Sequence, residues 1–212
     1  MKARMMRTKT NNSSHRIFFW VFVLALSFSF QKNILAEDMP SKLEKATFAA
    51  GCFWGVEKVF SALPGVVSTQ VGYLGGTLKN PTYEQVCSGR TGHAEAIEIE
   101  FDPSKISYDE LLEVFFRNHD STTMNRQGND IGTQYRSAIF YHSESQRLAA
   151  QKALDALNTA KIFKNSIVTT LELATEFYRA EEYHQKYLKK NPLGYCHIQL
   201  QSAKISEVLK KR

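Results

Sequence analysis

One alternating segment, residues 93–101, constrains the fold of this chain more than any other. Apolar and polar residues alternate in it with a period of two, which is the period of a β-strand. One face carries His93, Glu95, Ile97, Ile99 and Phe101. Alanines and glutamates form the other face. A strand with one mostly apolar face must be covered by a second layer, so the segment indicates a layered fold.

The rest of the chain mixes helices and strands without a strict strand–helix repeat. Further strands are predicted over residues 45–50, 66–73, 134–141 and 168–173, and helices over 53–63, 111–116, 143–160 and 180–190. Capping boxes at Ser107–Glu110 and Ser143–Gln146 open two of these helices. Polar loops are expected over 74–92 and 120–132. This order predicts an α+β two-layer sandwich, with helices packed on a mainly antiparallel sheet.

The net charge is concentrated at the N-terminus. The 212-residue chain has 27 basic and 21 acidic residues, but residues 1–36 contain six of the basic ones and none of the acidic ones. Residues 37–212 therefore carry 21 charges of each sign. A neutral domain lacks the basic surface that general phosphate binding requires, so no nucleic-acid partner is expected. The hydrophobic content of 43% is that of an ordinary globular domain and excludes a disordered chain.

Residues 1–36 have the pattern of a signal peptide. Basic residues precede an apolar run at 17–30, and Ala36 offers a small residue for cleavage. The run is shorter than the roughly 20 apolar residues of a spanning helix, and an uncleaved signal anchor is the alternative. Both interpretations predict that residues 37–212, a single domain with its core at about 45–197, are exported to the periplasm or another extracytoplasmic space. The leader is then the only expected contact with a membrane.

Cys52 is the first candidate for chemistry. It follows Gly51 at the end of a predicted strand and stands at the start of a predicted helix, where N–H groups and the helix dipole favour an anion. We therefore expect the pKa of this thiol to be lowered from about 8.5 toward 7 or below, which would make it a nucleophile. The alternative is a buried structural cysteine packed against Phe53 and Trp54. Beside a reactive thiol, the same aromatic pair could form an apolar pocket for a small substrate group.

Glu95 is the second candidate. If its face of the strand is the core, burial raises the pKa of its carboxyl group and keeps it protonated near pH 7, as a general acid requires. The alternative is a solvated carboxylate at the edge of the sheet. His93 lies two residues away and could suggest a metal pair, but no Cys or His cluster with zinc spacing accompanies it. No metal is therefore expected.

Two phenols and two further cysteines complete the candidates. Tyr83 and Tyr135 could donate hydrogen bonds to a polar substrate oxygen without carrying charge, or could be ordinary aromatic residues of the core or surface. Cys196 lies in a late Gly-Tyr-Cys turn, where it could resolve an oxidised cysteine or be a free thiol. Cys87 lies in a loop rich in Gly and Ser and is interpreted as a bystander.

Six motifs together carry a family resemblance. They are GCFWG at 51–55, GYxGG at 72–76, PxYE at 81–84, GxTGHxE at 89–95, NRQGNDxGTQYRS at 125–137 and AExYHQxY at 180–187. In this order, and over about residues 45–197, they closely resemble the A-type peptide methionine sulfoxide reductases. These enzymes repair one epimer of oxidised methionine. The resemblance implies a ferredoxin-like α+β core with long loops, and reduction of methionine-S-sulfoxide, free or in proteins, by a monomer without a cofactor.

The resemblance also implies roles for individual residues. Cys52 matches the family nucleophile and Glu95 the acid, while Tyr83 and Tyr135 match the hydroxyls that bind the sulfoxide oxygen. Asp130 matches a carboxylate that helps to order the site.

Phe53 and Trp54 match the pocket around the S-methyl group of the substrate. Cys196 matches the first recycling cysteine, so a Cys52–Cys196 disulfide would be presented to a thioredoxin-like reductant. Some members carry a further cysteine near the C-terminus, whereas residues 197–212 contain none.

Two other functional classes are also considered. A Cys/His hydrolase would need a base such as His93, His119 or His184 near Cys52. A disulfide-exchange protein would contain a Cys-x-x-Cys motif, which this chain lacks. Only a reductase would release methionine from a peptide sulfoxide in the presence of dithiothreitol.

Overall fold

The computed structural model describes residues 42–195 and 198–212. The predicted leader at 1–36 and the candidate residue Cys196 lie outside the described residues. Within the described ranges, no helix combines the length and apolar character that a membrane span requires.

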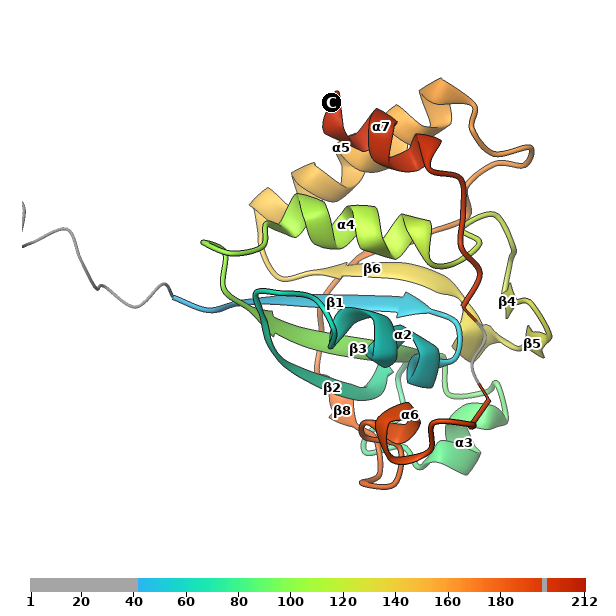
Figure 1. The fold of residues 1–212 in the computed structure, drawn as a ribbon. Helices are drawn as coiled ribbons and strands as arrows, with labels where there is room; N and C mark the ends of the chain where they lie inside the picture. Colours follow the sequence, from blue (N-terminus) through green and yellow to red (C-terminus); the bar gives the residue numbers. More distant parts are fainter. Residues whose placement is uncertain (1–41, 196–197) are drawn as a thin grey trace, which may run out of the picture. The chain divides into compact units, whose positions relative to one another are not determined.

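A six-stranded sheet forms the centre of the fold, with the strand order β7-β6-β1-β3-β2-β8 (Figure 1). Neighbouring strands are antiparallel except for β6 and β7, which run parallel. The strands are β1 Glu44–Ala50, β2 Val66–Leu74, β3 Ala94–Phe101, β6 Ser137–Tyr141, β7 Thr170–Leu173 and β8 Tyr178–Arg179. A separate hairpin consists of β4 Arg126–Gln127 and β5 Asp130–Ile131.

The helices connect these strands in a split βαβ arrangement. They are α2 Phe53–Phe60, α3 Tyr83–Cys87, α4 Tyr108–Arg117, α5 Glu144–Ala160, α6 Tyr187–Lys190 and α7 Lys204–Lys210, with a 3₁₀ turn, η1, at Thr133–Tyr135. The succession β1-α2-β2-β3-α4-β6, with β1 and β3 at the centre of the four strands, is the ferredoxin-like arrangement. The predicted α+β fold with a mainly antiparallel sheet is therefore confirmed.

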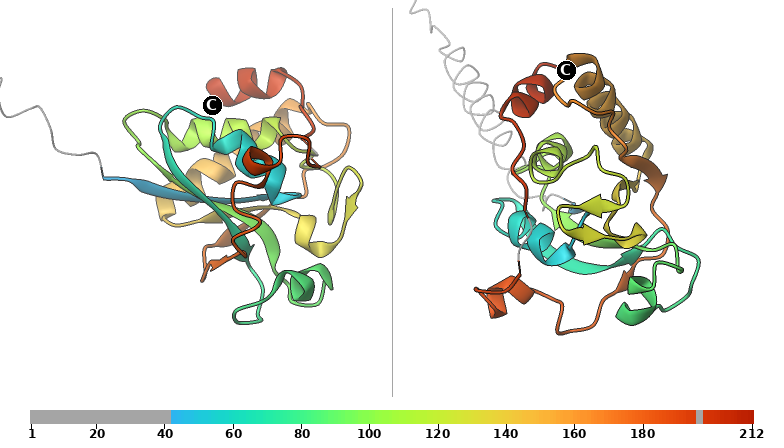
Figure 2. Two further views of the ribbon diagram at one scale, coloured as in Figure 1. Left: turned by 60° about the horizontal axis from the view of Figure 1, so that its bottom comes forward. Right: turned by 90° about the vertical axis from the view of Figure 1, so that its right-hand side faces the viewer.

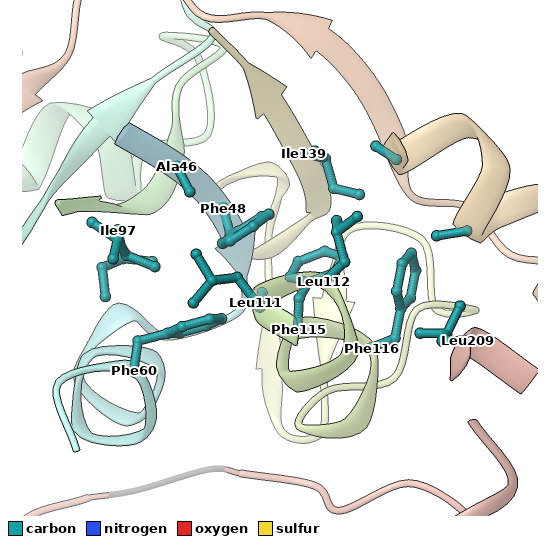
Figure 3. Packing of buried hydrophobic residues seen from close by; sticks show 14 of the residues in the cluster. Ala46, Phe48, Phe60, Ile97, Leu111, Leu112, Phe115, Phe116, Ile139 and Leu209 are labelled. Carbon is teal, nitrogen blue, oxygen red and sulfur yellow. The ribbon is translucent and has the colours of Figure 1, made fainter. Parts of the chain in front are cut away.

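The main core lies between one face of the sheet and helices α2, α4, α5 and α7 (Figure 3). Phe48 of β1 is fully buried at its centre, with its ring 5.5 Å from that of Phe60 and 5.1 Å from that of Phe115. Ile97 and Ile99 of β3 extend this layer, as their alternation predicted. Burial of this aromatic cluster stabilises the fold, because apolar burial is the dominant favourable term in folding.

The opposite face of the sheet contains small residues where the chain crosses closely over it. Ala94 and Ala96 of β3 are buried there, and Ala174 and Phe177 pack against this cluster. Farther along β3, Glu98 is only partly buried and forms an ion pair with Lys45 at 2.8 Å. Both faces of β3 are thus covered near its N-terminal end, where Glu95 lies.

The sequence-based prediction of a helix over 180–190 is wrong for most of its length. Residues 178–179 form the edge strand β8, and the helix begins only at Tyr187 because Lys186 has a left-handed backbone with φ of 51°. The Gln185 side chain replaces helical hydrogen bonds with tertiary ones, to the backbone N–H and C=O of Val71 and to the C=O of Ala180. The resulting short helix α6 lies beside α2 (Figure 2).

Three smaller differences concern the loops and the C-terminus. The expected loop over 74–92 contains helix α3, which is opened by a capping box between Thr82 and Gln85. Tyr135 ends the 3₁₀ turn η1, so it does not share the strand face of Ile139 as expected. The C-terminal residues, for which no element was predicted, form α7, whose Ile205 is fully buried in the main core.

Candidate active site

Cys52 lies at the junction between β1 and α2. Gly51 precedes it with φ of +90°, a conformation that a residue with a Cβ rarely adopts, and a Cβ added at Gly51 would lie 2.6 Å from Cγ of Gln127. The chain can therefore turn sharply out of the sheet, and Cys52 occupies the N-cap position of α2. The Gln127 side chain packs closely against Gly51, so the loop that contains Asp130 lies against this turn.

The expected lowering of the Cys52 pKa is wrong. Backbone N–H groups of Trp54 and Gly55 do lower it, as the helix start predicted, but burial and the neighbouring charges of Glu95 and Asp130 outweigh them. The pKa of the thiol is raised to about 12. Cys52 is therefore a neutral thiol in the free protein near pH 7.

Glu95 lies on β3, and only 2% of its surface is exposed. Its Oε2 accepts a hydrogen bond from the backbone N–H of Phe53 at 3.0 Å, which is an N–H group of the first turn of α2. Burial raises the pKa of the carboxyl group to about 8, and this outweighs the lowering by the Phe53 N–H. Glu95 is thus a protonated carboxyl group beside Cys52 at neutral pH, and the alternative of a solvated carboxylate does not hold.

Tyr83 and Tyr135 approach this pair from two other elements. Tyr83 is the first residue of α3 and Tyr135 the last of η1, and both are partly buried. Burial, followed by other effects that include the charge of Glu95, raises the pKa of each phenol. Both therefore remain neutral hydrogen-bond donors over the physiological range. Cys87 ends α3, one turn after Tyr83, and each of the two side chains influences the pKa of the other, so Cys87 is close to the site, although its sequence position suggested a bystander.

An aromatic wall stands beside the thiol. Phe53 is buried, and Trp54 stacks on Tyr187 with ring centroids 3.8 Å apart and an angle of 14° between the planes. The indole N–H of Trp54 donates to Nδ1 of His184 at 3.0 Å, and the His184 ring also packs 4.5 Å from that of Tyr83. The wall thus joins α2, α3 and the segment that leads into α6.

Sequence reasoning placed no functional role on Tyr187 or Glu181, and it considered His184 only as the base of a hydrolase. Glu181 accepts hydrogen bonds from Tyr73 Oη at 2.8 Å and from the backbone N–H of Tyr83 at 2.9 Å, which fixes α3 against the 181–186 segment. The presence of Glu, His and Tyr in the motif at 180–187 was the only sequence signal for a role of these residues. It did not reveal these contacts, because they join residues about 100 positions apart.

Asp130 lies on β5 at the edge of the site. Its Oδ1 accepts a hydrogen bond from Tyr195 Oη at 3.1 Å, and its charge raises the pKa of both Cys52 and Glu95. Tyr195 directly precedes Cys196, so the described part of the C-terminal segment reaches the site at this bond. The position of Cys196 itself lies outside the described residues.

The three histidines considered as hydrolase bases have other partners. His93 contacts the backbone of Gly76 and Leu78, and His184 accepts from Trp54. His119 is held between the Phe115 carbonyl and Ser137, and burial lowers its pKa to about 4. Across residues 42–195 and 198–212, acidic, His and Cys side chains form no group of three that could hold a metal ion.

Together, a cysteine at a helix start, a protonated carboxyl group, two phenols and an aromatic wall define a cysteine-dependent enzyme that can protonate a substrate oxygen. Comparison with known proteins identifies the family. The sequence model described as "Peptide methionine sulfoxide reductase" matches residues 44–212. The chain therefore belongs to the peptide methionine sulfoxide reductase family, and as a member it is an oxidoreductase that uses thiols to reduce methionine sulfoxide.

Individual relatives agree with this assignment. The peptide methionine sulfoxide reductase MsrA of Methanothermobacter thermautotrophicus is 58% identical over 158 residues, which cover 74% of this chain and 94% of the relative. The crystal structure of reduced Mxr1 from Saccharomyces cerevisiae has a TM-score of 0.72 and 39% identity, covering 77% of this chain and 94% of that one. Methionine sulfoxide reductase A of Corynebacterium diphtheriae has a TM-score of 0.66 and 42% identity, covering 76% of this chain and 80% of that one.

The raised pKa of Cys52 predicts how this thiol reacts with iodoacetamide. In a Cys87→Ser/Cys196→Ser background, the alkylation rate at Cys52 should still be rising at pH 9, because only the thiolate reacts and burial keeps the thiol largely protonated up to that pH. Mass spectrometry of samples quenched at successive times gives these alkylation rates. Glu95→Gln should be alkylated faster than the background protein above pH 8, where the wild-type carboxylate is charged and disfavours the thiolate. A plateau of the Cys52 rate at or below pH 8 would contradict the assignment.

Proposed function

We propose that the chain reduces methionine-S-sulfoxide, in proteins and as the free amino acid, through a sulfenic acid on Cys52. The observation that carries this proposal is the hydrogen bond between the Phe53 N–H and Glu95 Oε2, at 3.0 Å. It places a buried carboxyl group, protonated at neutral pH, beside the nucleophile at the start of α2. A sulfoxide needs both, because its sulfur is electrophilic and its oxygen becomes basic as the S–O bond weakens.

The first step transfers oxygen from the substrate to Cys52. The S-methyl group packs against Phe53 and Trp54, and the sulfoxide oxygen accepts hydrogen bonds from Tyr83 and Tyr135. Glu95 protonates this oxygen while the Cys52 sulfur attacks the substrate sulfur, and the thiol proton is released to restore the acid. The hydroxyl group then moves from the substrate sulfur to the Cys52 sulfur, so the S–O bond of the substrate breaks. The bond between the two sulfurs breaks with its electron pair left on the substrate sulfur, methionine leaves, and Cys52 becomes a sulfenic acid.

The high pKa of Cys52 fits this sequence of events. The thiol remains neutral until an acceptor occupies the site, and ionised Glu95 is one of the charges that disfavour the thiolate. Keeping Glu95 protonated removes that charge. Binding of a polarised sulfoxide and protonation of its oxygen therefore accompany activation of the thiol.

The second stage returns the enzyme to the thiol state. Cys196 condenses with the sulfenic acid of Cys52 to form a disulfide and water. A thioredoxin-like dithiol then exchanges with this disulfide, becoming oxidised as the two enzyme thiols are restored. A structure of Mxr1 from Saccharomyces cerevisiae in complex with Trx2, with a TM-score of 0.52 and 25% identity to this chain, supports this kind of partner.

Separate substitutions of the two cysteines should distinguish their roles. Cys52→Ser should release no methionine even in a single turnover, because the attacking sulfur is missing. Cys196→Ser should release about one methionine per enzyme and then stall with a thioredoxin-like donor. Chromatographic measurement of methionine under single- and multiple-turnover conditions tests both. Sustained turnover of Cys196→Ser with that donor would refute the resolving role.

Glu95→Gln should slow the reduction of methionine sulfoxide by about 10²–10⁴-fold, which is the usual contribution of a general acid. Glutamine preserves the size of the side chain and can still accept from the Phe53 N–H, but it does not supply the proton. Single-turnover release of methionine from a peptide sulfoxide measures the effect. A rate within about twofold of the wild-type rate would show that Glu95 is not the acid.

The proposal extends to the place where the enzyme acts. The basic, apolar leader at 1–36 supports export, as a cleaved signal peptide or a membrane anchor, and repair of oxidised methionine in envelope or secreted proteins by a monomeric enzyme. In an oxidising compartment a Cys52–Cys196 disulfide would accumulate without a dithiol partner. An exported or membrane-fed thioredoxin-like protein is therefore the expected reductant.

Cell fractionation tests the location directly. Export predicts that the protein, detected with an antibody, occurs outside the cytoplasm with its leader removed or held in the membrane. N-terminal sequencing of that protein distinguishes cleavage from anchoring. Soluble full-length protein in the cytoplasm would contradict export and leave the proposed chemistry intact.

A further inference from the structure

A groove of about 370 Å³ lies beside the aromatic wall, between α2, the start of β2 and α6. Its apolar surface includes Val67 and Leu188, and Val67 is 58% exposed. Trp54 lines this groove and, like Tyr83, packs against the buried cluster that contains Phe53. The groove and the proposed substrate pocket therefore share the Trp54 side chain.

The groove has a basic rim. Lys58 of α2 and Lys186 and Lys189 at α6 line it, and none of the three forms an ion pair with a residue in the described part of the chain. The acidic lining residue, Glu57, is 2% exposed and accepts hydrogen bonds from the Lys186 backbone N–H at 2.6 Å and from Thr69 Oγ1 at 3.1 Å. Burial raises the pKa of Glu57, while the nearby Lys186 and Lys190 lower it. The groove lining thus contains three basic residues and one acidic residue, and the acidic one is buried.

We propose that this groove binds the part of a protein substrate that flanks the methionine sulfoxide, and that it favours an acidic residue two or three positions from the sulfoxide. The inference rests on the proposed function, because it takes the sulfoxide to lie against Trp54. Charge complementarity selects the acidic side chain, and the exposed Val67 beside Leu188 accepts the apolar part of the same segment.

The spacing of the two helix residues sets the distance from the sulfoxide. Lys58 follows Trp54 by four positions in α2, so the two lie on the same helix face and about 6 Å apart along its axis. An extended peptide advances about 3.3 Å per residue. A residue two or three positions from the sulfoxide would thus reach the lysine ammonium groups, whereas free methionine sulfoxide would not enter the groove.

The test uses the full chain and uncharged host peptides of glycine with one central methionine-S-sulfoxide. Glu, Gln or Lys is placed two positions away, on either side, and dithiothreitol is the reductant. For at least one side, wild-type kcat/KM should be about three- to tenfold higher for the Glu than for the Lys peptide, as expected for exposed ion pairs. High salt should reduce this preference. Equal kcat/KM values for all peptides would overturn the proposal, whereas absence of methionine from every peptide would instead refute the proposed function.

Charge-reversal variants assign the preference to the groove. Lys58→Glu/Lys189→Glu should invert the ratio of kcat/KM for the Glu and Lys peptides, and Lys58→Gln/Lys189→Gln should bring it close to one. This ratio does not depend on the fraction of active enzyme, so partial misfolding leaves the result interpretable. The matched control, Lys152→Glu/Lys161→Glu, changes the net charge equally on exposed positions of α5 and its C-cap, and should keep the wild-type ratio. Unchanged ratios in the groove variants would overturn the proposal.

The same variants exclude other occupants. If the groove instead bound the protein reductant, charge reversal would slow turnover with a thioredoxin-like donor and leave the peptide ratio with dithiothreitol unchanged. If it bound a second copy of the chain, charge reversal would change the mass measured by light scattering, again without altering the ratio. Either result would contradict substrate binding in the groove.

Discussion

The hydrogen bond between the Phe53 N–H and the Glu95 carboxyl group determines much of the remaining site. It joins the start of α2 to β3, the central strand that also pairs with β1 and β2. An N–H group of the first helical turn needs a partner outside the helix, and Glu95 supplies one in the interior. The bond therefore places the acid beside the thiol. The acid is held by a central strand of the sheet and needs no separate loop to position it.

This arrangement also explains the electrostatics of the site. A helix start alone would favour a thiolate at Cys52. However, the burial that keeps Glu95 protonated also disfavours a negative charge on Cys52. Burial acts on both groups in the same direction and keeps both neutral. The free enzyme thus holds a thiol and an acid together, and neither is consumed by proton exchange with the other before a substrate arrives.

The sequence predicted the parts of the fold that depend on local signals. The alternation of β3 and the capping box at Ser107 predicted elements that the structure contains, because each signal acts within a few residues. The Ser143 box is realised only in part. The Ser143 side chain caps the helix, whereas the Gln146 side chain bonds instead to the backbone of His142 and Lys45.

The errors arose where distant contacts decide the outcome. The motif at 180–187 reads as a helix, but the side chain of Gln185 satisfies the backbone of β2 instead. The pKa of Cys52 could not be predicted from its own position, because Glu95 and Asp130 come from other elements. For the same reason the sequence revealed the identities of the candidate residues but not the support of Trp54 by His184 and Tyr187.

The C-terminal segment has a consequence for the speed of the second stage. Tyr195 is bonded to Asp130, the backbone N–H of Gln201 is bonded to the carbonyl of Arg117, and α7 is packed into the core beyond them. In the sequence, only residues 196–200 separate these two anchors, and Cys196 is one of them. A short tether gives a reactant an effective concentration in the millimolar range or above. In the proposed mechanism, a resolving thiol tethered in this way would need no diffusional encounter, and the sulfenic acid proposed for Cys52 would have a short lifetime against further oxidation.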